Sequence, residues 1–107
     1  MYTDLEDKLS KEYYIEILNN ALARAKEDYE NFPKVPIHIS FYNQLIDIKK
    51  TVVDESKIYT RDEAYDKYPM AVTVNRNFLG KEGNTDYAKM IKDIVWGISL
   101  YPTMPEK

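Results

Sequence analysis

The side chains that usually carry out covalent or metal chemistry are scarce in this sequence of 107 residues. It contains no cysteine and a single histidine, His38. The lack of cysteine excludes disulfides, thiolate zinc sites and a cysteine nucleophile, and one histidine cannot build a multi-histidine metal site. A Ser-His-Asp triad would need Ser40 or Ser56, and neither lies in a turn typical of a nucleophilic serine. The sequence therefore predicts no enzymatic activity, no metal and no cofactor.

Tyrosine, in contrast, is abundant. Its ten residues are about three times the ordinary share. Tyrosine offers a large contact area at low rotamer cost and keeps a polar hydroxyl, which makes it common at protein interfaces. We predict that a partner is contacted by three clustered tyrosines and the single tryptophan: Tyr59, Tyr65, Tyr68 and Trp96. The alternative, that these rings cover a small core with their hydroxyls in water, stays open.

The charge balance is mildly acidic, with fifteen Lys and Arg against eighteen Asp and Glu and a formal net charge of −3. Proteins that bind nucleic acids usually need a basic face that neutralises phosphates, so this class is disfavoured. It is kept as an alternative that would use the cations Lys49, Lys50, Arg76, Lys81, Lys89 and Lys92.

One short segment has a family likeness. Residues 78–83, FLGKEG, resemble the GxxG loop of KH domains, which is also followed by a helix. Glu82 would repel a phosphate in that loop, and Asp86 stands where the family has an aliphatic residue. No family function is carried over from this segment.

Four stretches have the apolar spacing of amphipathic helices. They are residues 11–31 after an N-cap at Ser10, residues 40–55, residues 61–68 after a capping box at Thr60, and a last helix capped by Thr85. The stretch 40–55 is rich in β-branched residues and would also suit a strand.

Two other segments alternate apolar and polar residues, as strands do. The pattern runs over residues 35–41 and again over residues 70–76. Because a lone strand is unstable, the two would pair as one short ribbon. The predicted fold class is an α-rich single domain of three to four helices, or α+β if this two-stranded ribbon forms.

The length allows one domain over residues 1–107, since two independent cores would need a longer chain. We expect residues 1–9 to be a short N-terminal leader and residues 101–107 an extended tail. No apolar run approaches the roughly 20 residues needed to cross a bilayer, and the acidic start is unlike a secretory signal. We therefore expect a cytoplasmic protein without membrane contact.

These observations favour an intracellular, non-enzymatic inhibitor or neutraliser of another protein. Bacterial immunity proteins and small phage or viral proteins that block a host factor share this size and helical layout. The acidic faces would attract a partner with a basic surface, and the tyrosines would supply contact energy. A small nucleic-acid-associated regulator, or a homo-oligomer that binds a small ligand, are the alternatives.

Overall fold

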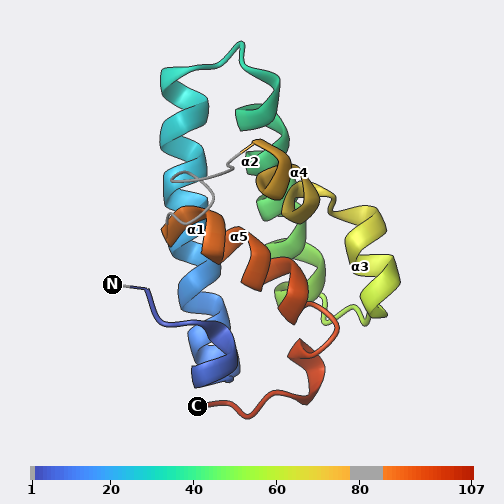
Figure 1. The fold of residues 1–107 in the computed structure, drawn as a ribbon. Coiled ribbons are helices and arrows are strands. Elements are labelled where there is room, and N and C mark those ends of the chain that lie inside the picture. The colour runs from blue at the N-terminus through green and yellow to red at the C-terminus, as the bar shows by residue number, and fades with distance from the viewer. Residues whose placement is uncertain (1, 78–85) are drawn as a thin grey trace.

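Every regular element is helical in residues 2–77 and 86–107, the part of the chain that the computed structural model describes (Figure 1). The α-rich class is therefore confirmed. In these two described ranges, five α-helices are accompanied by short 3-10 or π turns. In chain order the elements are η1 (Leu5–Lys8), α1 (Lys11–Asn31), α2 (Pro36–Ile48), η2 (Lys49–Asp54), α3 (Arg61–Lys67), α4 (Met70–Asn77), α5 (Asp86–Gly97) and η4 (Tyr101–Thr103).

Helix α1 begins where the sequence predicts. The Ser10 hydroxyl accepts a hydrogen bond from the amide three residues later, at 3.1 Å. The first two amides of the helix donate to the backbone carbonyls of Pro105 and Glu106, at 2.8 and 3.1 Å. Amides in the first turn of a helix have no partner within it, so here the C-terminal segment completes the cap of α1.

The predicted ribbon is wrong in its first half, because residues 36–41 belong to α2. Pro36 takes the first helical position, where its missing N–H is no loss, and the extended Val35 precedes it. The helix then buries Phe41, Leu45 and Ile48, which follow helical spacing. Helix α2 runs antiparallel to α1 and continues into the π-helical turn η2, so residues 40–54 are helical and not a strand (Figure 1).

The second half of the ribbon is wrong as well, because residues 70–76 lie in α4. Met70, Ala71 and Val74 are buried, and this spacing is helical although the local composition favours a strand. Tertiary contacts help to set the start of the helix: the Met70 amide donates to the Gln44 side chain of α2 at 3.0 Å. The predicted helix 61–68 is confirmed as α3, and Thr60 forms the predicted capping box with Glu63.

Helix α5 crosses the α1–α2 pair and also packs against α3 and α4 (Figure 1). Its buried face comprises Tyr87, Ala88, Ile91, Ile94 and Val95. The predicted cap at Thr85 and the glycine-containing segment 78–83 lie outside the described residues.

Both ends of the described chain take part in the core. Leu5, in η1 of the predicted leader, is fully buried. The predicted extended tail instead starts with the 3-10 turn η4, which places Tyr101 and Met104 among the buried residues. Apolar side chains in both segments explain this docking, since their burial is favourable.

Helix α1, helix α5 and the turn η1 approach one another closely at Gly97. A Cβ atom at this position would lie 2.8 Å from both Leu5 Cδ2 and Tyr14 Cε2, so that one or both side chains would have to shift. The buried Tyr14 hydroxyl donates to the Ile94 carbonyl at 2.7 Å. This carbonyl is in the last turn of α5, where helical carbonyls lack partners within the helix.

We expect Gly97→Ala to destabilise the protein by about 1 to 3 kcal/mol, because the added methyl group overpacks the core and outweighs the better helix propensity of alanine. Urea denaturation measures the change. A double-mutant cycle with Leu5→Ala is the control: if the clash is the cause, the two effects are less than additive. Full additivity would contradict this explanation.

Candidate functional site

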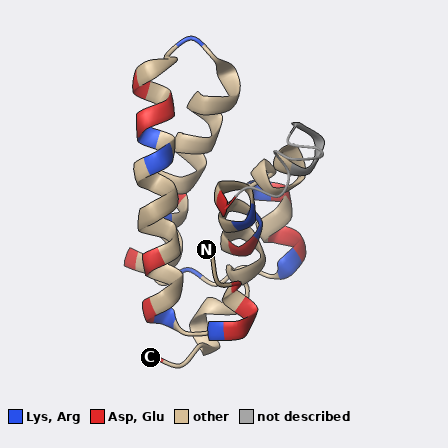
Figure 2. Cartoon of the chain, turned by 60° about the vertical axis from the view of Figure 1, so that its left-hand side comes forward, with Lys and Arg blue, Asp and Glu red and all other residues tan. Residues whose placement is uncertain are grey.

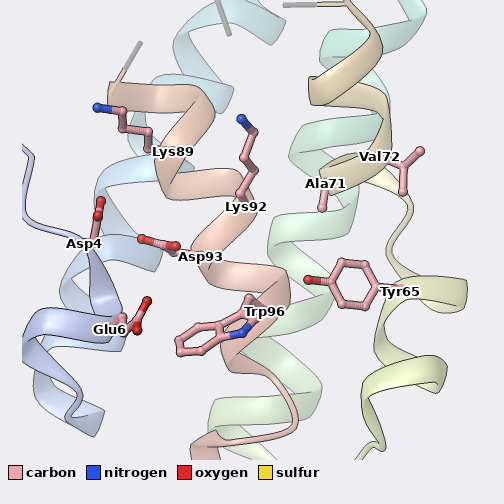
Figure 3. Close-up of a pocket in the computed structure, with 9 residues that line it drawn as sticks. All are labelled: Asp4, Glu6, Tyr65, Ala71, Val72, Lys89, Lys92, Asp93 and Trp96. Carbon is pink, nitrogen blue, oxygen red and sulfur yellow. The ribbon is translucent and has the colours of Figure 1, made fainter. Parts of the chain in front are cut away.

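A groove of about 500 Å³ lies along the outer face of α5 (Figure 3). We call it the α5 groove. Helix α5 contributes four residues to it: Lys89, Lys92, Asp93 and Trp96. Their spacing of three, four and seven residues places them on one face of the helix, opposite to the face that enters the core.

Two walls flank α5. On one side the segment before and within η1 contributes Asp4 and Glu6. On the other side α3 contributes Tyr65, and α4 contributes Ala71 and Val72. Figure 3 shows the Trp96 ring extending from α5 toward Glu6, whereas the Tyr65 hydroxyl points from α3 toward α5. Segments that are far apart in the sequence therefore form one surface.

The apolar part of the groove consists of Trp96, Tyr65 and Val72. Trp96 and Tyr65 are half-buried and pack against the core, so their remaining surface is held in place. The guanidinium of Arg61 lies 5.8 Å from the centre of the Tyr65 ring, in cation–π range. Val72 lies on the α4 side of the groove and is 44% exposed, which is high for an aliphatic side chain.

Charges of both signs surround these apolar side chains. Lys89 and Lys92 provide positive charge, and the exposed Asp4 and Glu6 provide negative charge. Asp93 has a structural role as well, since its carboxylate accepts hydrogen bonds from the Tyr2 hydroxyl at 2.6 Å and the Leu5 amide at 3.1 Å. These bonds hold the N-terminal wall of the groove against α5.

The structure brings together only two of the four residues predicted to contact a partner. Tyr65 and Trp96 share the α5 groove. Tyr68 is 1% exposed and belongs to the core, where its hydroxyl donates to the Asp47 carboxylate at 2.6 Å. Tyr59 packs edge-on against Tyr68, with ring centres 6.3 Å apart, and its hydroxyl is buried.

The position of Tyr68 has a local cause that the sequence contains. Ala64 and Tyr68 are four residues apart, and both are buried, so they define the inner side of α3. Tyr65 follows Ala64 by one residue and therefore lies on a different side of the helix. The spacing from Ala64 therefore distinguishes the buried Tyr68 from the half-buried Tyr65. Their closeness in the sequence does not distinguish them.

The lysines predicted for the nucleic-acid alternative do not form one surface. Lys89 and Lys92 line the α5 groove, whereas Lys49 and Lys50 line a separate groove beside α1 and α2. The side chain of Arg76 and the whole of Lys81 lie outside the described residues. Acidic residues lie near both lysine pairs, and Figure 2 shows basic and acidic positions interspersed over the ribbon.

Sequence reasoning missed Asp4, Glu6, Ala71 and Val72, which come from segments that only the fold places beside α5. Asp93 could have been found from the helical spacing that it shares with Lys89 and Trp96.

Comparison with known proteins adds no assignment: no family model matches this chain, and no curated protein or solved structure is significantly similar to it. None of the helices in residues 2–77 and 86–107 combines the length and the apolar character that a membrane span requires. Within the same residues, no three His, Asp or Glu side chains are grouped so that they could hold a metal ion.

The burial of several tyrosines predicts that the stability of this fold depends on pH. Burial is the largest cause that raises the pKa of Tyr2, followed by its hydrogen bond to Asp93. Burial also raises the pKa of five others: Tyr13, Tyr14, Tyr68, Tyr87 and Tyr101. Unfolded tyrosine ionises near pH 10, so above this pH the native state holds more protons than the unfolded state. Stability is thus retained below about pH 10 and lost as the pH rises further.

We therefore expect the urea midpoint to fall steadily from about pH 9.5 to about pH 11.5. Tyr2→Phe should lower stability at neutral pH, because it removes the bond to Asp93, and should make the alkaline loss less steep. Urea unfolding at several pH values, with tyrosinate absorbance recorded in parallel, measures both effects. A midpoint that stays constant over this range would contradict the pKa directions.

Proposed function

We propose that this protein is a non-enzymatic inhibitor that binds another protein through the α5 groove. The observation that carries the proposal is that Trp96 and Tyr65 line the same groove, which has the exposed Val72 on its α4 side and charged residues at its edges. Tryptophan and tyrosine in partly desolvated pockets supply most of the energy in many protein interfaces.

The charges at the groove indicate the chemistry of the partner. Asp4 and Glu6 favour a basic group on one side of Trp96, in line with the net charge of −3. Lys89 and Lys92 favour an acidic group farther along α5. The proposed ligand is therefore a segment of a partner protein whose apolar side chain would occupy the space beside Trp96. The surface of the partner around this side chain would be mainly basic, with an acidic group at one end.

Nucleic acid is a weaker candidate for the same groove. A phosphate backbone would be attracted by the two lysines but repelled by Asp4 and Glu6. The mixed charges instead resemble the polar rim that surrounds the apolar centre of a protein interface.

We expect Val72→Asp to weaken partner binding at least about tenfold, since it places a charge in the exposed apolar part of the groove wall that α4 forms. The experiment captures proteins from a lysate of the source cells on the immobilised wild type and on the variant. Val35→Asp is the matched control, because Val35 is similarly exposed at 37% but lies outside the groove, at the N-cap of α2.

A protein retained by the wild type and by Val35→Asp but lost with Val72→Asp supports the proposal. Inhibition of that protein's own activity by the wild type then tests the inhibitory role. Equal retention on all three proteins, or a captured protein whose activity does not change, would contradict it. Trp96 is the single tryptophan of this chain, so its fluorescence reports whether the groove is filled when the added segment contains no tryptophan.

A further inference from the structure

A second groove of about 500 Å³ runs between α1 and the α2–η2 segment. We call it the hairpin groove. Its residues include Leu22 and Lys26 of α1, Tyr42 and Ile46 of α2, and Lys49 and Lys50 of η2. It shares no residue with the α5 groove, so the two surfaces can be tested independently.

The centre of the hairpin groove is apolar. Ile46 is 42% exposed, and Leu22 and Tyr42 are only half-buried. The Tyr42 ring stacks on Tyr29 of α1, with ring centres 5.3 Å apart, so the ring is held in place beside the groove. The packing of the described chain thus leaves an apolar strip between two helices.

Lysines stand on both sides of this apolar strip. Lys26 belongs to α1, whereas Lys49 and Lys50 belong to η2 across the groove. All three are exposed, and among residues 2–77 and 86–107 none of them forms an ion pair or a cation–π contact. Of the described residues, Asp54 brings a negative charge to the groove. Three lysines against one aspartate leave the groove positively charged, although the whole chain has a net charge of −3.

The lysines of the hairpin groove differ from other cations of this chain, which are engaged within the fold. Five cations lie over tyrosine rings in cation–π range: Lys8, Lys11, Arg24, Arg61 and Lys67. Because the groove lysines have no such contact, their charge is available to an acidic ligand.

We propose that the hairpin groove binds an acidic amphipathic helix of another protein. A groove between two helices accepts a third helix that lays its apolar face along the strip. Tyr42 and Lys50 are eight residues apart, or about 12 Å along the helix axis, so about two turns of the ligand would be in contact. Asp or Glu on one flank of the ligand would meet Lys26, and those on the other flank would meet Lys49 and Lys50.

Other ligands fit this groove less well. A second copy of this chain would place the lysines of both copies opposite one another in a symmetric contact. Glu27 and Glu30 lie one and four residues after Lys26, toward the turn between α1 and α2, and both are exposed. They would repel the head groups of an anionic membrane or the phosphates of a nucleic acid, whereas a helix of about two turns need not extend over them.

The first experiment identifies the chemistry of the ligand without assuming its sequence. A phage library of random peptides of about 16 residues, enough for about four helical turns, is selected on the immobilised wild type. We expect enrichment of peptides with apolar residues at helical spacing and with Asp or Glu on both flanks. Ile46→Glu should retain these peptides at least about tenfold less well, because it places a negative charge in the apolar strip. Ile58→Glu is the matched control: Ile58 is 76% exposed and lies outside the groove, so its variant should retain them as the wild type does.

Charge reversal tests the contacts of the lysines. The dissociation constant of a selected peptide that carries a fluorescent label is measured by anisotropy. Lys49→Glu with Lys50→Glu should raise it at least about tenfold, and changing the acidic residues of the peptide to lysine should restore binding to this variant. Lys34→Glu with Lys57→Glu changes the net charge equally, but neither residue lines the groove, so its effect should be much smaller. Circular dichroism confirms that each variant is folded.

Acidic amphipathic peptides whose retention depends on Ile46, together with restored binding in the charge-reversed pair, support the proposal. Val72→Asp should retain the same peptides, which separates this result from any test of the α5 groove. Selected peptides that bind equally well to Ile46→Glu, or that depend on Ile46 but carry no acidic residues, would overturn the proposal. Binding of anionic vesicles or of oligothymidylate that depends on Ile46, when no selected peptide does, would also overturn it and would assign the groove to lipid or to nucleic acid.

Discussion

The close approach of α5 to α1 at Gly97 is the constraint on which the other contacts depend. Without a side chain at this position, Leu5 and Tyr14 can lie directly against the α5 backbone. The buried Tyr14 hydroxyl also needs a partner, and the Ile94 carbonyl supplies it at 2.7 Å. Steric fit and hydrogen bonding therefore select the same crossing of the two helices, so α5 has a defined position and rotation.

That rotation determines which residues α5 presents to solvent. With Ile91, Ile94 and Val95 facing inward, the opposite stripe forms the bottom of the α5 groove. Asp93 lies in this stripe and holds the N-terminal segment through Tyr2 and Leu5. One side chain thus contributes to the groove and fixes one of its walls, and the same contacts that stabilise the fold define the candidate site.

Features that depend on neighbouring residues could be predicted from the sequence, and features that depend on distant ones could not. The caps at Ser10 and Thr60 involve residues three apart, and they mark the starts of α1 and α3 correctly. Alternation over 70–76 indicated a strand, but Gln44 and the core contacts of Met70 and Val74 favour a helix. Tyr65 and Trp96 could be chosen as candidate contact residues by their type, whereas Asp4, Glu6 and Val72 join them in the α5 groove only through the tertiary fold.

The cap of α1 by the carbonyls of Pro105 and Glu106 links elements from opposite ends of the described chain. During synthesis α1 emerges from the ribosome long before these carbonyls exist, and before Gly97 can receive Tyr14. Until then the inner side of α1, with Ile17 and Leu18, lacks its final covering, and η1 and α2 are the neighbours already made that can shield part of it. The native core can therefore close only after translation has passed residue 106, and until then the packing of α2 and η1 on α1 limits the apolar surface that the growing chain exposes.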